Sequence, residues 1–306
     1  MRPLRGIALK LASVMVFIVM ASLIKSTAQH VPAGQAVFFR SFFAIPVIMG
    51  WLAWRKELST GLKTVQPLGH VWRGVVGTMA MGMGFAGLGY LPLPEVTAIG
   101  YAAPLLTVVF AAMFLGEEVR AFRISAVILG MVGVSIVLAP RLSIDPGSAG
   151  VAEALGAMLV LGGAVFAALA QVFVRKLVNT EQTSAIVFWF SVTATVMSLI
   201  TLPFGWVWPT MGEAAILVGA GLLGGLGQIL LTSSYREADA SLVAPFDYAS
   251  MIFALGIGYF VFSEVPTLPM LGGAALIVTA GILIIWRERA LGLERARQRK
   301  AMTPQG

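Results

Sequence analysis

The sequence predicts an all-α integral membrane protein of ten transmembrane helices. These helices form two inverted five-helix repeats, with the N-terminus and the C-terminus both cytoplasmic. Of the 306 residues, 58% are hydrophobic and only 11% are charged, and the mean hydropathy is +0.90. Such values indicate a chain that lies mostly within a bilayer. Two further observations support the fold class: basic residues gather in alternate loops, and two distant apolar segments resemble each other.

Ten apolar stretches are each close to the length of roughly 20 residues that a bilayer-spanning helix needs. The first follows MRPLRG and has no clear small-residue cleavage site, so we interpret it as a retained helix rather than a signal peptide. The connections LPLP (91–94) and GEEVRAF (116–122) are too short to hold a separate domain. The ten spans are expected at roughly 6–25, 35–54, 71–91, 96–115, 124–140, 151–174, 184–206, 213–234, 241–262 and 268–286.

The basic residues indicate the orientation. With a cytoplasmic N-terminus, 18 of the 21 Lys and Arg residues fall on the cytoplasmic side, and only Lys25, Arg40 and Arg141 do not. This is the bias that the positive-inside rule describes. One missed helix would reverse every later loop and destroy the bias, so the distribution supports ten spans.

An internal repeat relates TAIGYAAPLLTVVFAAMFLGEEV (97–119) to VAPFDYASMIFALGIGYFVFSEV (243–265). A shift of 147 residues aligns Tyr101 with Tyr248. Five spans separate the two copies, so the second copy enters from the opposite face, as in the inverted repeats of transporters. We therefore expect a first repeat, a second repeat and a basic cytoplasmic tail at residues 1–145, 146–286 and 287–306.

Several classes of function are excluded or disfavoured. The chain has no cysteine, and His30 and His70 lie between apolar runs, so neither a metal site nor a cofactor is expected. A membrane-embedded enzyme would need a nucleophile or clustered carboxylates within the bundle, which the sequence does not offer. The glycine-rich stretches 81–90 and 219–228 lack the Lys-Ser or Lys-Thr of a nucleotide-binding loop. The net charge of +7 comes from loops and does not indicate a nucleic-acid partner.

Arg40 lies within the apolar stretch VFFRSFFAIP (37–46), about 9 Å below the outer start of the second span. An arginine at such depth costs about 2.5–3.5 kcal/mol on insertion scales. Two interpretations are open. Its side chain extends to the outer headgroups, or it faces the bundle interior, where it binds an electronegative part of a substrate or anchors helix packing.

Two carboxylates are candidates for coupling or gating. Asp247 follows Pro245 in the ninth span, toward the cytoplasmic side and out of reach of Arg40. It carries a coupling proton or holds a neighbouring helix, or it caps a helix that is broken at the proline. Glu95, at the outer start of the fourth span, either caps that helix or takes part in gating.

The remaining polar candidates are two glutamines within spans and four tyrosines, namely Tyr90, Tyr101, Tyr248 and Tyr259. Tyr101 and Tyr248 occupy equivalent repeat positions within spans and could form two sides of one cavity, with ordinary packing as the alternative. The glutamines contact substrate or bond between helices. Glu117 and Glu264 end their spans and are expected to be structural. The candidate substrate contacts are Arg40, Tyr101, Tyr248, Gln171 and Gln228.

A family resemblance rests on KLASVMVFIVMASLIK (10–25), VFFRSFFAIP (37–46), LGE (115–117) and APFDYASMIFALGIGYFVFSE (244–264). These stretches resemble the EamA-domain branch of the drug/metabolite transporter superfamily, over essentially the whole chain. The resemblance implies a secondary transporter of a small organic metabolite in the bacterial cell inner membrane, working by alternating access without a cofactor.

Among the characterised members of this branch, riboflavin transporters and amino-acid exporters are the ones to compare with this chain first. An aromatic-lined cavity with one cation and few acids suits a flat aromatic solute, and both riboflavin and aromatic amino acids fit that description. The family resemblance favours riboflavin, so riboflavin uptake is the expected function. Export of amino acids or related metabolites is the alternative. The expected partners are a small-molecule substrate and membrane lipids, with the basic tail against anionic headgroups. A non-transporting scaffold or receptor that docks through its tail is the alternative of another class.

Overall fold

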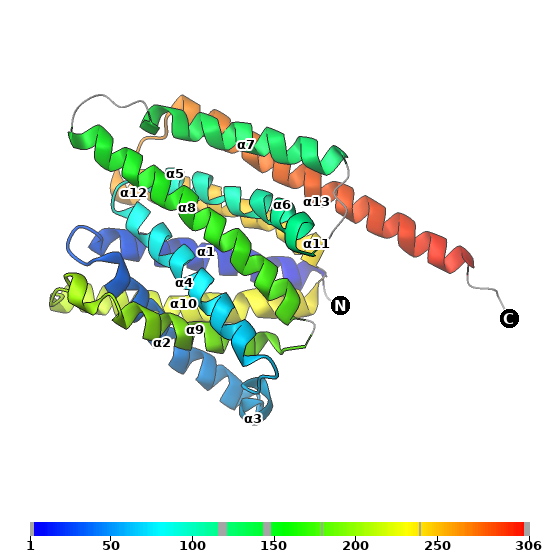
Figure 1. Cartoon of the computed structure of the whole chain (residues 1–306), viewed down its shortest axis with the longest axis horizontal. Coiled ribbons are helices and arrows are strands. Elements are labelled where there is room, and N and C mark those ends of the chain that lie inside the picture. Colours follow the sequence, from blue (N-terminus) through cyan, green and yellow to red (C-terminus); the bar gives the residue numbers. More distant parts are fainter. Residues whose placement is uncertain (1–2, 116–120, 143–147, 179, 239, 303–306) are drawn as a thin grey trace.

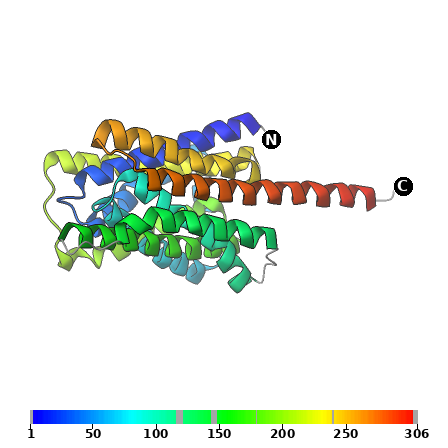
Figure 2. The same ribbon diagram turned by 90° about the horizontal axis from the view of Figure 1, so that it is seen from above.

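The computed structural model describes residues 3–115, 121–142, 148–178, 180–238 and 240–302, and its regular structure there is helical throughout. Glu117 lies outside the described residues. The long helices lie side by side, and α1 begins at the end of the bundle from which the last part of α13 projects, here termed the terminal end (Figures 1 and 2). The elements are α1 (Pro3–Thr27), α2 (Ala33–Trp54), α3 (Leu58–Gly61), α4 (Pro67–Leu88), α5 (Leu93–Gly100), α6 (Ala102–Leu115), α7 (Ala121–Leu142), α8 (Ser148–Leu177), α9 (Thr183–Leu199), η1 (Leu202–Phe204), α10 (Met211–Glu237), α11 (Ala240–Val243), η2 (Ala244–Tyr248), α12 (Ala249–Phe262) and α13 (Leu268–Met302).

Eight helical segments among the described residues are long and apolar enough to cross a membrane. The chain is therefore a multi-pass membrane protein. Two more helices would complete the predicted ten. One is α4, whose 22 residues include His70 and Arg73, and the other is α9, which has 17 residues. Both lie within the bundle, with α4 against α8 and α9 against α2 (Figure 1).

The fourth and ninth predicted spans are interrupted rather than continuous. Tyr101 separates α5 from α6, and Tyr248 ends the 3-10 helix η2 just before α12. Proline accounts for both irregularities, because its ring nitrogen cannot donate a helical hydrogen bond. Pro104 leaves the carbonyl of Gly100 without its usual α-helical donor, and Pro245 lies in η2. Each interruption therefore falls at a tyrosine of the internal repeat.

The two halves of the chain make the same set of helix contacts. α1 packs against α10 as α8 packs against α4, and α2 packs against α10 as α9 packs against α4. α2 also packs against α9, and α7 packs against α13. Suppose that α1 is exchanged with α8, α2 with α9, α4 with α10, and α7 with α13. Each of these contacts then becomes either another contact of the same set or the same contact again. Two repeats of opposite orientation would produce this exchange.

Apolar side chains fill the interior and also cover the outside. One of the buried clusters includes Leu105, Val134 and Ile277, from α6, α7 and α13. On the outside, Ile252 is 71% exposed and Phe260 is 84% exposed. Such side chains suit contact with lipid tails, while the helices satisfy the backbone hydrogen bonds internally.

Candidate functional site

A cavity of about 830 Å³ lies between α1, α6, α8, η2 and α13. Its volume is within the range of small-molecule sites. Lys10 in the first half of α1 and Gln171 in the last turns of α8 line it, so the cavity occupies the half of the bundle nearer the terminal end. Asp247 also lines the cavity, and its side chain is 50% exposed. The cavity is therefore accessible from the terminal end.

An ion pair lies in this cavity. The Nζ atom of Lys10 is 2.7 Å from the Oδ1 atom of Asp247. The Lys10 side chain is only 2% exposed, so its charge is removed from solvent almost completely. The pair joins α1 of the first half to η2 of the second. An ammonium and a carboxylate side by side can bind a ligand that carries both signs of charge, because each can exchange its partner for the ligand's group.

Tyr101 and Tyr248 both line the cavity and touch each other. Their ring centroids are 5.0 Å apart with an interplanar angle of 67°, an edge-to-face arrangement. The Tyr101 hydroxyl forms a hydrogen bond with the Ser250 hydroxyl. The helix interruptions thus bring the two repeat tyrosines together at one wall. Their contact with substrate stays a prediction.

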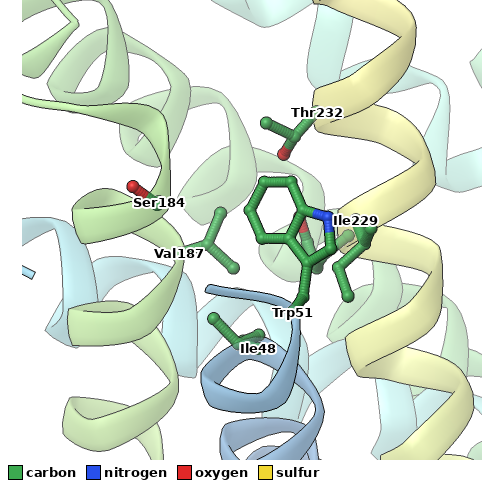
Figure 3. Close-up of a pocket in the computed structure, with 7 residues that line it drawn as sticks. Ile48, Trp51, Ser184, Val187, Ile229 and Thr232 are labelled. Carbon is green, nitrogen blue, oxygen red and sulfur yellow. The ribbon is translucent and has the colours of Figure 1, made fainter. Parts of the chain in front are cut away.

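The structure separates the two predicted glutamines. Gln171 lines the cavity. Gln228 instead lines a void of about 10 Å³ between α2, α9 and α10, which has room for about one water molecule. Figure 3 shows the Trp51 indole among the side chains that line this void, between Val187 of α9 and Ile229 of α10. Gln228 is therefore not among the described residues that line the large cavity.

Arg40 is inside the bundle but does not line the large cavity. It is 4% exposed, so its side chain does not extend to the headgroups. Its guanidinium carbon lies 5.7 Å from the ring centroid of Phe190 in α9. Of the two interpretations from the sequence, the interior one agrees with this burial. Among the described residues that line the cavity, the cation is Lys10.

Glu95 lies at the end of the bundle away from the cavity. Its carboxylate accepts two hydrogen bonds from Arg141, at 2.7 and 2.8 Å, and it is 5% exposed. Arg141 also donates to Glu153 at the start of α8. Glu95 therefore connects α5 to α7 and α8 rather than meeting substrate in this cavity.

Glu264 and Lys25 form a second ion pair at the same end. The Lys25 Nζ atom lies 3.0 Å from the Glu264 carboxylate and donates to the carbonyls of Leu88 and Leu91. The other carboxylate oxygen of Glu264 accepts from the amide of Leu93. The expectation of a structural Glu264 agrees with these contacts. They hold α1, α5 and α12 together opposite the cavity opening.

Sequence reasoning missed Lys10, which was counted only among the basic residues of the cytoplasmic side. The available signal was its position two turns into α1, with apolar residues on both sides in IALKLASV (7–14). Ser250, which holds the Tyr101 hydroxyl, was missed as well. No group of His, Asp and Glu side chains in the described part of the chain is arranged to hold a metal ion.

Two segments of the chain, residues 4–139 and 154–286, match the EamA-like transporter family. The chain belongs to the EamA-like transporter family. It is a transporter and not an enzyme. Residues 95–204 also match solute carrier family 35. The two EamA-like matches fall on the two halves whose helix contacts exchange.

Several relatives of this transporter are named by their solutes. It is 31% identical over 283 residues to a pseudopaline exporter of Pseudomonas aeruginosa, covering 91% of this chain and 95% of the relative. It is 30% identical over 256 residues to an S-adenosylmethionine uptake transporter of Rickettsia bellii, covering 83% and 84%. It is 29% identical over 259 residues to a riboflavin transporter of Rhizobium johnstonii, covering 84% and 82%.

A solved crystal structure shares the fold of this transporter. The TM-score is 0.65 at 20% sequence identity, over 94% of this chain and 98% of that chain. The curated relatives include importers and an exporter of different solutes. The comparisons therefore support transport of a small metabolite and leave the solute to be argued from the cavity.

Proposed function

We propose that this protein is a ten-helix secondary transporter of the bacterial inner membrane, in which the 830 Å³ cavity alternates between the two sides. The observation that carries the proposal is the Lys10–Asp247 ion pair inside that cavity. It joins the two halves of the chain, and the interface between its two repeats is where an inverted-repeat transporter binds its solute. A charged pair at membrane depth is costly and is typical of a functional site.

The inverted repeat is supported by reciprocal contacts at the ends of α2 and α9. Gln35, at the start of α2, exchanges two hydrogen bonds with the backbone of Val207, after α9. Ser184, at the start of α9, donates to the carbonyl of Gly61, after α2. Together with the exchange of helix contacts, this reciprocity is what two halves of opposite orientation predict. In this arrangement, with its terminal end cytoplasmic, the cavity opens inward.

The substrate class follows from the pair of charges. A solute with an amino-acid group offers a carboxylate to Lys10 and an ammonium to Asp247, so both charges stay partnered when it binds. Tyr101 and Tyr248 provide an aromatic wall for a ring on the same solute. S-adenosylmethionine has both parts, and a relative is named for its uptake. We therefore propose an amino-acid derivative that carries a flat ring as the solute.

Riboflavin, which the sequence favoured, is the second candidate. The aromatic wall and the riboflavin transporter among the relatives support it. The support that Arg40 gave to riboflavin in the sequence analysis weakens, because Arg40 does not line the cavity.

Asp247 is the proposed coupling residue, since its half-exposed carboxylate can take up a proton when the solute or Lys10 leaves it.

Purified protein in liposomes, with labelled S-adenosylmethionine and labelled riboflavin in parallel, tests the proposal. We expect saturable transport of S-adenosylmethionine that falls about tenfold or more in Lys10→Met and Asp247→Asn, because each variant leaves a charge of the solute without its partner. Lys63→Met, at an exposed lysine outside the spans, is the matched control. Transport of riboflavin alone, unaffected by these variants, would establish the second candidate. Transport of neither would reject both solutes.

A further inference from the structure

Two arginines from different helices meet on one aromatic ring in the bundle interior. The Cζ atom of Arg73 in α4 lies 3.7 Å from the ring centroid of Phe190 in α9, and the Cζ atom of Arg40 in α2 lies 5.7 Å from it. Neither arginine is among the described residues that line the 830 Å³ cavity. The cluster is therefore distinct from the proposed substrate site.

Several donors of this cluster have no acceptor among the described residues. The Nε atom of Arg40 and the Nε and Nη1 atoms of Arg73 are buried without a hydrogen-bond partner. None of the ion pairs between described residues involves either arginine. The Phe190 ring attracts both cations, but a ring accepts no conventional hydrogen bond from them and does not remove their mutual repulsion.

The backbone around the cluster is shaped to admit the two side chains. A Cβ atom on Gly77 would lie 2.9 Å from the Phe190 ring and 3.0 Å from Nη1 of Arg73. A Cβ atom on Gly224 would lie 3.1 Å from Nε of Arg40. Glycine at these two positions of α4 and α10 therefore leaves the space that the guanidinium groups occupy. The arginines are accommodated by packing from four helices.

We propose that Arg40 and Arg73 form a binding site for one compact anion, a halide ion or a carboxylate group, between α2, α4 and α9. An anion would supply the acceptor that the buried guanidinium nitrogens lack and would offset the repulsion between the two cations. Arg40 is 4% exposed, so the site admits only a small group. Arg73 is partly exposed and lies in the second turn of α4, which begins at the terminal end, so an anion reaches the site from there.

Thermal unfolding of the full-length protein in detergent tests this site without using transport. The sodium salt of the bulky sulfonate MES serves as the baseline, and chloride or acetate replaces it at constant ionic strength. We expect a saturable rise in Tm with at least one of the two anions. Arg40→Gln and Arg73→Gln should raise the half-saturating concentration by about tenfold or more. Arg55→Gln, at an exposed arginine paired with Glu57, should leave it unchanged.

The two anions identify the source of the negative charge. A response to chloride alone assigns an inorganic anion, a response to acetate alone assigns a carboxylate group, and a response to both assigns a site for either. No saturable response in the wild-type protein would overturn the proposal, as would an equal response in the arginine variants. If those variants fail to fold, wild-type crystals decide the question, grown with bromide where chloride raised the Tm and with acetate where acetate alone did. An anomalous bromide peak, or acetate density in the second case, between the two guanidinium groups supports the site, and its absence overturns it.

Discussion

Lys25 lies 3.0 Å from Glu264 at the end of the bundle opposite the cavity opening, and both side chains are largely buried, at 14% and 13% exposure. The pair joins α1 of the first half to the segment that follows α12 in the second half. Under the proposed alternating access, this end opens when the terminal end closes. We predict that the Lys25–Glu264 contact then separates, so that a pair which holds this end together in the present conformation also acts as a gate.

Glu264→Gln should favour opening at this end, because it removes a charge-assisted pair that contributes about 1.5–3 kcal/mol. The chain has no cysteine, so a single Leu91→Cys substitution gives a clean probe at a position that is 1% exposed. We expect a membrane-impermeant maleimide to label this cysteine roughly tenfold faster in the Glu264→Gln background.

Glu237→Gln is the matched control for this labelling. Glu237 pairs with Arg5 at the terminal end, where a lost contact should not expose Leu91. An unchanged labelling rate in Glu264→Gln would show that the pair does not restrain opening.

Lys10 and Asp247 should be energetically coupled in the empty transporter. Lys10→Met and Asp247→Asn are each expected to lower stability, and the double variant should lose less than the sum. Since the Asp247 side chain is 50% exposed, solvent screening holds the expected coupling to about 0.5–1 kcal/mol. Unfolding midpoints of the four proteins measure it. Additive losses would mean that the two charges act independently.

The Tyr101 hydroxyl should matter for solute binding more than for folding. Tyr101→Phe keeps the ring packed against Tyr248 and loses the hydrogen bond to Ser250, which contributes about 1 kcal/mol to stability. We expect KM for the transported solute to rise severalfold with Tm nearly unchanged. Tyr259→Phe, at a tyrosine that is 54% exposed, is the control. Equal KM values for both variants would remove the Tyr101 hydroxyl from the binding site.

Stability should fall at acidic pH through Glu181, in the connection between α8 and α9. Burial raises the pKa of this carboxyl, but hydrogen bonds from the amides of Gln66 and Val65 and from the Thr64 hydroxyl outweigh burial, so its pKa lies below 4.5. A lowered pKa means that Glu181 stabilises the fold fully above its unfolded-state pKa and loses this effect as pH falls through its folded-state pKa.

Glu181→Gln tests this dependence. At pH 7 we expect a loss of about 1–3 kcal/mol, because the amides of Val65 and Gln66 and the Thr64 hydroxyl lose a charged acceptor. The difference in Tm between the wild-type protein and the variant should shrink as pH falls below about 4.5. A difference that stays constant from pH 7 to low pH would contradict the assignment.

Most helix positions could be predicted, because a run of about 20 apolar residues is itself the signal of a helix that crosses the bilayer. The predicted span 35–54 corresponds to α2 at Ala33–Trp54, and 124–140 corresponds to α7 at Ala121–Leu142. The interruption at Tyr101 was not predicted, because hydropathy averaged over a span does not register one irregular residue. Pro104 was the local signal for it.

The candidate site was harder to predict, because it depends on which face of each helix turns inward. Asp247 and Gln171 were singled out as polar groups within spans, and both line the cavity. Lys10 was not, since a lysine near the start of a span usually reaches the headgroups. Arg73 was likewise counted with the cytoplasmic charges. Its contact with Phe190 depends on how α4 packs against α9, which no single-helix pattern contains.

The cavity pair has no counterpart in the other half of the chain. The shift of 147 residues that aligns the two tyrosines places Gly100 where the second half has Asp247. Two inverted halves with identical side chains would give two access orientations of equal free energy. Under the proposed alternating access, one orientation forms an ion pair at its solute site for which the other half has no equivalent residues. We then expect the empty transporter to have a preferred resting orientation, and a bound solute to change the rate at which it leaves that orientation.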